Sequence, residues 1–324
     1  MGGDVGSREG DEHDGFRDDA EHDGLRVDAG PGARDTVTLG ADVLRRYAAF
    51  SRFNSPYPAH DDGRAIDLYP TDGAPSPVAG EVVETLTTRA PDRPYAEAND
   101  HLIVVDTGDH LARLLHVEPS VEPGDVLAVG DPLGRTIRSG YFAPWVDDHV
   151  HLGFRPRDAD PVRASGSLPV AVDVEVEPVP WDGRGTVVER GDTYVVLDAP
   201  GHPAPGERFA GVAADGWGRG ALDGGLPHYA GGGLVGGDRR GDGRVSLAGH
   251  RVGRVAGGLV TWDDVAVFAN GVRVYGLSFA CHRDRLGAKL VAWDGVPAEV
   301  GESVAVAVRR PEEGAGEGRS AGHR

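Results

Sequence analysis

The stretch Asp147-Asp148-His149-Val150-His151-Leu152-Gly153-Phe154 alternates between polar and apolar residues, which is typical of a β-strand. Side chains two residues apart in a strand point to the same face, so the imidazoles of His149 and His151 project into one space. Metal hydrolases often place one histidine on the metal and a second beside it for proton transfer. Three further candidates, His60, Asp67 and His116, lie upstream. Together these five side chains form a set suited to a zinc hydrolase.

Short strands separated by turns rich in Gly, Pro and Asp are predicted on both sides of this stretch. In the first half the clearest are 78–83, 102–105, 111–117, 126–129 and 149–154. In the second half they are 185–188, 194–197, 259–262, 265–268, 272–277, 289–293 and 304–308. Residues 169–180 contain alternating valines and indicate a strand or linker. The pattern predicts an all-β chain with one β domain at 53–166 and a second β-rich domain at 170–310.

The remaining segments are of other kinds. Leu39, Val43, Leu44, Tyr47 and Phe50 have helical spacing, which predicts a short helix over 36–52 whose apolar stripe packs on the following domain. Residues 1–35 are acidic and Gly-rich with few aliphatic side chains, so they are predicted to be disordered, and 311–324 to be a polar tail. Residues 200–250 are dominated by glycine, and 231–233 and 236–237 suggest flexible loops.

Composition narrows the class of protein. The chain has 324 residues and a formal net charge of −19, which argues against nucleic-acid binding because that function needs a basic surface. Lys289 is the sole lysine, and an acidic chain so poor in lysine is expected of a high-salt cytoplasm. The single cysteine, Cys281, excludes internal disulfides and lies in an apolar run, so it is predicted to be a core residue. Neither an apolar run of membrane-spanning length nor a secretory signal is seen, which predicts a cytoplasmic protein without a membrane span.

The first β domain resembles a known family over about residues 53–160. Five pieces occur in order: Gly63-Arg64-Ala65-Ile66-Asp67-Leu68-Tyr69-Pro70, Ser76-Pro77-Val78-Ala79-Gly80-Glu81-Val82, Leu114-Leu115-His116-Val117, the stretch 121–134, and His149-Val150-His151-Leu152-Gly153-Phe154. This order is similar to that of the M23 (lysostaphin/LytM-type) zinc metallopeptidases. The resemblance implies the duplicated hybrid motif fold and a peptide substrate. It implies an endopeptidase or amidase that hydrolyses a peptide bond with a metal-activated water.

The same resemblance implies the role of each residue. Asp67 and His151 match the family's Zn²⁺ ligands, and His116 and His149 match the unliganded catalytic pair that handles protons and polarises the carbonyl. Catalytic zinc takes three protein ligands and leaves one position for water, so a third ligand is needed. The family's first histidine falls four residues before Asp67, where this chain has Gly63. His60 is the nearest candidate, and a turn at Gly63 would fold it back to the metal; Asp61 or Asp62 are the substitutes.

Other interpretations remain open at this point. The presence of Gly63 where the family has its first histidine favours a non-catalytic M23-like domain that acts as a binding or structural module. A phosphotransfer domain would use His116 as its phosphate acceptor and would not need Asp67. A biotinyl or lipoyl carrier is excluded because Lys289 lies outside the matching hairpins. Tyr57, Tyr69, Tyr141 and Trp145 either line a cleft or pack in the core, and the remaining histidines, including His101 and His110, show no metal-ligand spacing.

Overall fold

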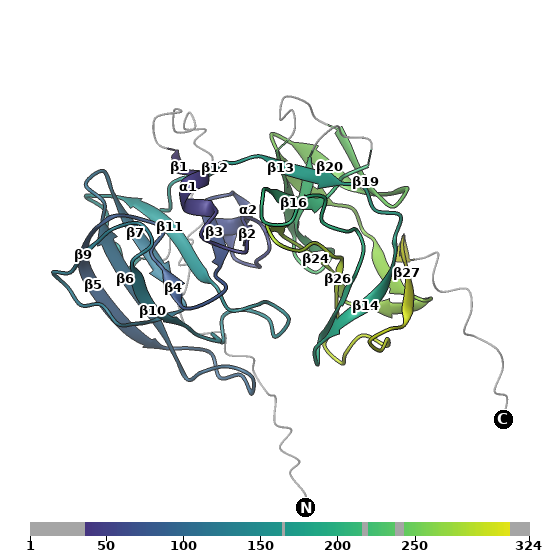
Figure 1. The fold of residues 1–324 in the computed structure, drawn as a ribbon, viewed down its shortest axis with the longest axis horizontal. Helices are drawn as coiled ribbons and strands as arrows, with labels where there is room; N and C mark the ends of the chain where they lie inside the picture. Colours follow the sequence, from purple (N-terminus) through teal and green to yellow (C-terminus); the bar gives the residue numbers. More distant parts are fainter. Residues whose placement is uncertain (1–35, 164–165, 216–219, 237–242, 312–324) are drawn as a thin grey trace, which may run out of the picture.

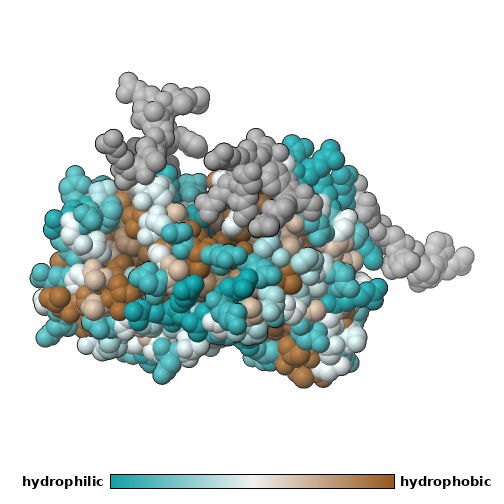
Figure 2. All heavy atoms as spheres, turned by 45° about the horizontal axis from the view of Figure 1, so that its top comes forward, coloured by the Kyte–Doolittle hydropathy of each residue, from teal (hydrophilic) through white to brown (hydrophobic). Residues whose placement is uncertain are grey.

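The computed structural model describes residues 36–163, 166–215, 220–236 and 243–311. It is nearly all β, as the sequence predicted (Figure 1). The predicted disordered segment 1–35 and residues 312–324 of the predicted tail 311–324 lie outside the described residues, as does Gly237. No helix among the described residues is long and apolar enough to cross a membrane. One face of the surface is mostly hydrophilic, with hydrophobic residues gathered in smaller groups (Figure 2).

The first domain comprises twelve strands and two short helices. They are β1 (Val37–Gly40), α1 (Ala41–Leu44), β2 (Ala49–Ser51), α2 (Pro58–Asp61), β3 (Ala65–Tyr69), β4 (Ala74–Pro75), β5 (Gly80–Arg89), β6 (Asn99–Asp106), β7 (His110–Leu115), β8 (Val117–Pro119), β9 (Val126–Leu127), β10 (Pro132–Thr136), β11 (Val150–Pro156) and β12 (Val170–Asp173).

The described part of the second domain comprises strands. They are β13 (Val176–Val179), β14 (Arg184–Arg190), β15 (Tyr194–Leu197), β16 (Phe209–Val212), β17 (Ala221–Leu226), β18 (Gly231–Val235), β19 (Gly243–Leu247), β20 (His250–Ala256), β21 (Leu259–Trp262), β22 (Ala266–Ala269), β23 (Val272–Val274), β24 (Gly276–Phe279), β25 (Cys281–His282), β26 (Lys289–Val291) and β27 (Ser303–Arg309).

One sheet joins the two domains. Its ten strands run in the order β13-β16-β25-β2-β3-β11-β7-β6-β5-β9, so strands of the second domain continue directly into the sheet of the first. Strand β2 pairs with β3 on one side and with β25 on the other. A second sheet, of twelve strands, lies in the second domain, and β1 pairs with β12 in a separate two-stranded sheet.

The hydrophobic core crosses the same boundary. Phe50 of β2 and Phe209 of β16 meet edge to face with ring centroids 5.0 Å apart, and both side chains are fully buried. Cys281 is buried in this cluster, as predicted, and burial raises the pKa of its thiol. The two domains therefore share apolar contacts as well as backbone hydrogen bonds.

The predicted helix over 36–52 is largely wrong. Only Ala41–Leu44 are helical, because the residues on either side pair as β1 and β2. The apolar stripe is nevertheless buried in the core of the first domain, as expected from its spacing. Sheet pairing across the domain boundary has overridden the local helical pattern.

The prediction of flexible loops at 231–233 is also wrong. These glycines form β18, which pairs with β17 and β21. A Cβ at Gly233 would lie 2.2 Å from the ring of Phe53, and one at Gly232 would lie 2.4 Å from the ring of Trp262. Glycine is required here because aromatic rings pack directly against the backbone, and Phe53 brings the first domain into that contact.

Candidate metal centre

Two of the candidate ligands face each other across neighbouring strands. Asp67 lies on β3 and His151 on β11, and the two residues are directly opposite in the antiparallel register. Side chains at opposite positions share one face of the sheet, so the imidazole meets the carboxylate. His151 Nδ1 lies 2.9 Å from Asp67 Oδ1.

His60 reaches the same point from the short helix α2. After the helix, Gly63 adopts φ +65°, a left-handed conformation that suits glycine and turns the chain into β3. His60 Nδ1 donates a hydrogen bond of 2.8 Å to the carbonyl of Arg52, which leaves Nε2 facing the other two ligands. His60 Nε2 lies 3.1 Å from His151 Nδ1 and 3.4 Å from Asp67 Oδ1. His60, rather than Asp61 or Asp62, therefore joins this group.

The spacing of these three donor atoms fits a metal ion the size of zinc. Ligand atoms at ~2.0–2.1 Å from a tetrahedral zinc lie about 3.3–3.4 Å from one another. The observed separations of 2.9, 3.1 and 3.4 Å are within a few tenths of an ångström of that triangle. Two imidazoles and one carboxylate are also a donor set that catalytic zinc sites use. The residues present thus fit the ion that the sequence predicts.

The protonation states of the site favour a cation between the three residues. Burial alone would raise the pKa of Asp67, but the neighbouring His60, His149 and His151 hold it well below its usual range. Burial lowers the pKa of His151 to about 4, so its ring is neutral at pH 7. For His60, burial lowers the pKa, but the charge of Asp67 together with hydrogen bonds to Asp67 and to the carbonyl of Arg52 raises it overall. A bound divalent cation would replace the proton that Asp67 otherwise attracts onto His60.

His149 lies beside the three candidate ligands. Its Nδ1 donates a hydrogen bond of 2.8 Å to the carbonyl of Asp147, which fixes the tautomer and leaves Nε2 as the acceptor. His149 Nε2 lies 3.5 Å from Asp67 Oδ1. The ring packs against Phe142 and Tyr69, with centroids 4.7 and 5.3 Å away. Burial lowers its pKa, so the ring is neutral and can accept a proton.

His116 completes the group from the turn between β7 and β8. Its ring centroid lies 5.1 Å from that of His149 and 5.8 Å from that of His151. Its backbone has φ +66°, a left-handed conformation that is unfavourable for a residue other than glycine. Such a conformation persists where neighbouring contacts hold the backbone in place. Asp100 supplies that constraint, because one oxygen accepts from His116 Nδ1 at 2.7 Å and the other from its backbone N–H at 3.1 Å.

Asp100 and Ser139 were not predicted from the sequence. Asp100 lies on β6. The hydroxyl of Ser139, in a loop distant along the chain, donates a hydrogen bond of 2.8 Å to its carboxylate. Burial opposes ionisation of Asp100, but His116 and the other donors lower its pKa to about 2. The ionised carboxylate fixes the orientation and tautomer of the His116 ring, as the aspartate of a catalytic triad does for its histidine.

A cavity of about 370 Å³ opens beside the candidate metal centre. Its volume falls within the ~300–1,000 Å³ that is typical of small-molecule sites. Tyr57 and Tyr141 contribute to its wall, their rings meeting edge to face with centroids 6.4 Å apart. The other lining residues that matter for chemistry are Asp67, His116, His149, His151, Arg64 and Arg113. The site is therefore accessible to a ligand.

The second domain supports His60 through a chain of hydrogen bonds. Asp223 of β17 is fully buried and accepts from the hydroxyl of Ser51 and, at 2.7 Å, from the backbone N–H of Arg52. Ser51 Oγ in turn accepts from the backbone N–H groups of Phe53 and Asn54, at 3.3 and 3.0 Å. Asp223 thereby fixes the segment whose carbonyl holds His60. Nothing in the sequence near Asp223 indicated this contact.

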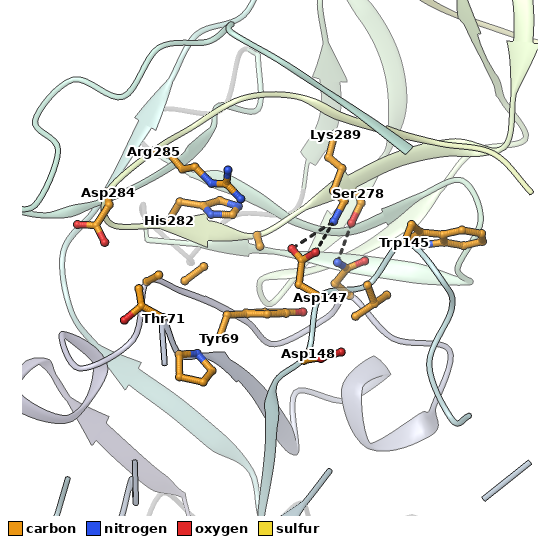
Figure 3. Close-up of a pocket in the computed structure, with 16 residues that line it drawn as sticks. Tyr69, Thr71, Trp145, Asp147, Asp148, Ser278, His282, Asp284, Arg285 and Lys289 are labelled. Carbon is orange, nitrogen blue, oxygen red and sulfur yellow. Dashed lines mark hydrogen bonds and ion pairs between the residues drawn. The ribbon is translucent and has the colours of Figure 1, made fainter. Parts of the chain in front are cut away.

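A second cavity, of about 400 Å³, lies between the domains (Figure 3). Lys289 of β26 reaches across it to Asp147, with Nζ 3.2 Å from each carboxylate oxygen. Tyr69 and Trp145 belong to its wall. Asp147 is also the residue whose carbonyl accepts from His149, so this ion pair ties the second domain to the loop that holds His149.

Several other histidines of the described residues make contacts of their own outside this group. His101 contacts Thr87 at 3.0 Å, and the ring of His110 packs on Phe154. His228 is buried among Trp145, Tyr229 and Tyr275, and burial lowers its pKa to about 3. Among the described residues, the three-ligand group contains His60, Asp67 and His151 only.

The chain is thus a two-domain all-β protein with a candidate His–Asp–His metal centre in its first domain. Residues 38–172 match the family described as Domain of unknown function (DUF8155) N-terminal domain, and residues 177–309 match the DUF8155 C-terminal domain. The two matches together cover most of the sequence, and the chain belongs to the DUF8155 family. No curated protein matches it.

One solved structure with some likeness is the catalytic domain of the antimicrobial peptidase lysostaphin from Staphylococcus simulans. The sequence identity is 21%, and the match covers 39% of this chain and 92% of that chain with a TM-score of 0.25. A TM-score of this size establishes no structural equivalence between the two domains.

Proposed function

We propose that the first domain is a zinc-dependent hydrolase of peptide bonds, an endopeptidase or amidase. The observation that carries the proposal is the convergence of His60 Nε2, Asp67 Oδ1 and His151 Nδ1 within 3.4 Å of one another, beside an open cavity that Asp67 and His151 line. The ordered sequence motifs that resemble the M23 family support the same reading.

In this proposal His60, Asp67 and His151 hold the metal. Zinc bound there would lower the pKa of a coordinated water toward ~7 and polarise a carbonyl group. His149, neutral and with Nε2 as an acceptor, takes the proton from the attacking water. His116, backed by the ionised Asp100, donates a hydrogen bond to the oxygen on which negative charge develops.

The first test is the zinc content of the full-length protein. One zinc per chain is expected for the wild type, and less after His60→Ala or His151→Ala, because each substitution removes one of three donors. His101→Ala is the matched control, since that histidine lies outside the cavity. A wild-type protein that binds no zinc, and whose stability ignores chelators, would refute the proposal.

The second test separates hydrolysis from mere binding. His116→Ala and His149→Ala should retain zinc but lose cleavage of a mixed peptide library measured by mass spectrometry. If the wild type binds zinc and cleaves no peptide bond, the domain is a non-catalytic binding module. That outcome would contradict the catalytic roles while leaving the metal centre intact.

A further inference from the structure

Arg113 lies inside the cavity of the candidate metal centre. It is on β7, directly opposite Gly153 of β11, while Leu115 of β7 is opposite His151. Residues two apart on a strand share a face, so the Arg113 side chain lies on the same face as His151. Diagonal neighbours across a strand pair are about 7–8 Å apart, which places Arg113 one diagonal step along the sheet from His151. Both Arg113 and Gly153 line the cavity.

The Arg113 guanidinium is buried without a partner. The residue is 7% exposed, its Nε makes no hydrogen bond, and no ion pair or hydrogen bond reaches it from the described residues. Burial and then the charge of nearby Arg155 lower the pKa of Arg113 to about 10, and the charge of Asp160 opposes them only in part. It remains charged at neutral pH, although burial of an unpaired charge is unfavourable.

Neighbouring arginines differ in this respect. Arg64 lines the same cavity but donates to the carbonyl of Ser167 at 2.9 Å and faces Asp62 at 3.5 Å. Arg155 donates to Ser167 and to the carbonyl of Arg163. In a chain with a net charge of −19, carboxylates are abundant; the charge of Asp160 acts on Arg113, but no carboxylate of the described residues lies within ion-pair distance of its guanidinium. Its missing partner is therefore expected to come from a ligand.

We propose that Arg113 binds a carboxylate of the substrate, on the residue adjacent to the bond that is cleaved. A guanidinium and a carboxylate pair through two parallel hydrogen bonds, which suits a buried cation with free N–H groups. Gly153 leaves space beside the guanidinium, since a Cβ there would meet only ordinary contacts at 3.7 and 3.8 Å. This inference rests on the proposed hydrolase function and names the substrate class: a peptide with an α-carboxylate or an acidic side chain at that position.

Calorimetric binding of small peptide probes tests the proposal. The probes are N-acetyl-alanyl-alanine, its C-terminal amide, and N-acetyl-glutamyl-alaninamide, with inorganic phosphate as a fourth. The wild type should bind at least one of the two probes that carry a carboxylate about tenfold or more tightly than the uncharged C-terminal amide of N-acetyl-alanyl-alanine. Arg113→Met should abolish that preference, and Arg113→Lys should retain part of it. Arg135→Met is the control, because Arg135 lies outside the cavity and is paired with Glu97 and Glu118.

The thermal unfolding midpoint without ligand gives a second readout. Arg113→Met should leave the midpoint unchanged or raise it, because the substitution removes an unpaired buried charge. If Arg113 instead stabilised the fold, Arg113→Met would lower the unfolding midpoint. The proposal is overturned by a lower midpoint in Arg113→Met, by equal affinity of the wild type for all peptide probes, or by tighter binding of phosphate than of either carboxylate.

Zinc content measured on the same samples keeps the two proposals apart. The probes are titrated into zinc-free and zinc-loaded protein. If the wild type holds no zinc, the hydrolase proposal fails while the comparison of carboxylate and amide probes still reports on Arg113. If zinc is bound but the probes do not discriminate, the carboxylate site alone is refuted.

Discussion

Replacement of Asp100 by asparagine tests how a buried carboxylate holds His116. Asp100 is 1% exposed and accepts hydrogen bonds from His116 Nδ1, the His116 backbone N–H, Ser139 Oγ and the His101 backbone N–H. These contacts lower its pKa from 3.8 to about 2. Lowering the pKa of Asp100 this far corresponds to about 2 kcal/mol of stability at neutral pH.

The sign of the pH dependence follows from the direction of the shift. Because the pKa of Asp100 is lower in the folded protein, its contribution is complete above pH ~4 and is lost as the pH falls through about 2. Asp100→Asn lacks this contribution at every pH. The difference in free energy of unfolding between the wild type and the variant should therefore be about 2 kcal/mol at pH 7 and should shrink below pH ~4.

Urea unfolding followed by tryptophan fluorescence, at pH 7 and at steps down to pH 2, measures this difference. Asp109→Asn, in the turn after β6, is the control because Asp109 is exposed. In Asp100→Asn the amide would also face His116 Nδ1 with a donor and favour the wrong tautomer, so peptide cleavage should be lost while zinc is retained. A stability difference that does not change with pH would refute the reasoning.

Three further predictions concern the contact between the domains. Gly233→Ala places a Cβ 2.2 Å from the Phe53 ring and should cost about 1–3 kcal/mol in urea unfolding, whereas Gly201→Ala, with nothing within 4 Å, should be neutral. Lys289→Met removes the ion pair with Asp147, whose side chain is 53% exposed, and should lower the free energy of unfolding by less than about 1 kcal/mol at low salt and by still less at high salt. Lys289→Arg should keep most of this stability. Equal losses at both salt concentrations would contradict an ion-pair contribution. Asp223→Asn should weaken zinc binding about tenfold in competition with a chromophoric chelator, because it disturbs the chain that holds His60, while Asp198→Asn, which only affects the Thr186 backbone contact, should not.

The sequence predicted the parts of the site that depend on local pattern. His149 and His151 were placed on one face by strand periodicity, and the order of the motifs indicated that Asp67 and His116 would join them. The structure brings all four together with His60, which the sequence offered only as the nearest candidate. A turn at Gly63 supplies the reach that the unusual spacing requires.

The rest depends on contacts between residues far apart in the chain. Asp100, Arg113 and Asp223 acquire their roles from strand register and from the domain boundary, and no spacing rule connects them to the histidines. The glycines of β17 and β18 look like loop residues by composition, but they are needed for backbone packed against aromatic rings. The segment 49–51 follows a helical pattern and becomes a strand because partners on both sides are available.

Strand β2 has a practical consequence for any attempt to divide this protein. Its three residues pair with β3 in one half, and two of them, Ala49 and Phe50, also pair with β25 in the other. A fragment cut between β12 and β13 would leave that ladder half open, and an uncovered strand edge recruits edges from other molecules. Either half expressed alone is thus prone to self-association. The shared sheet makes the two domains one folding unit, although each matches its own family model.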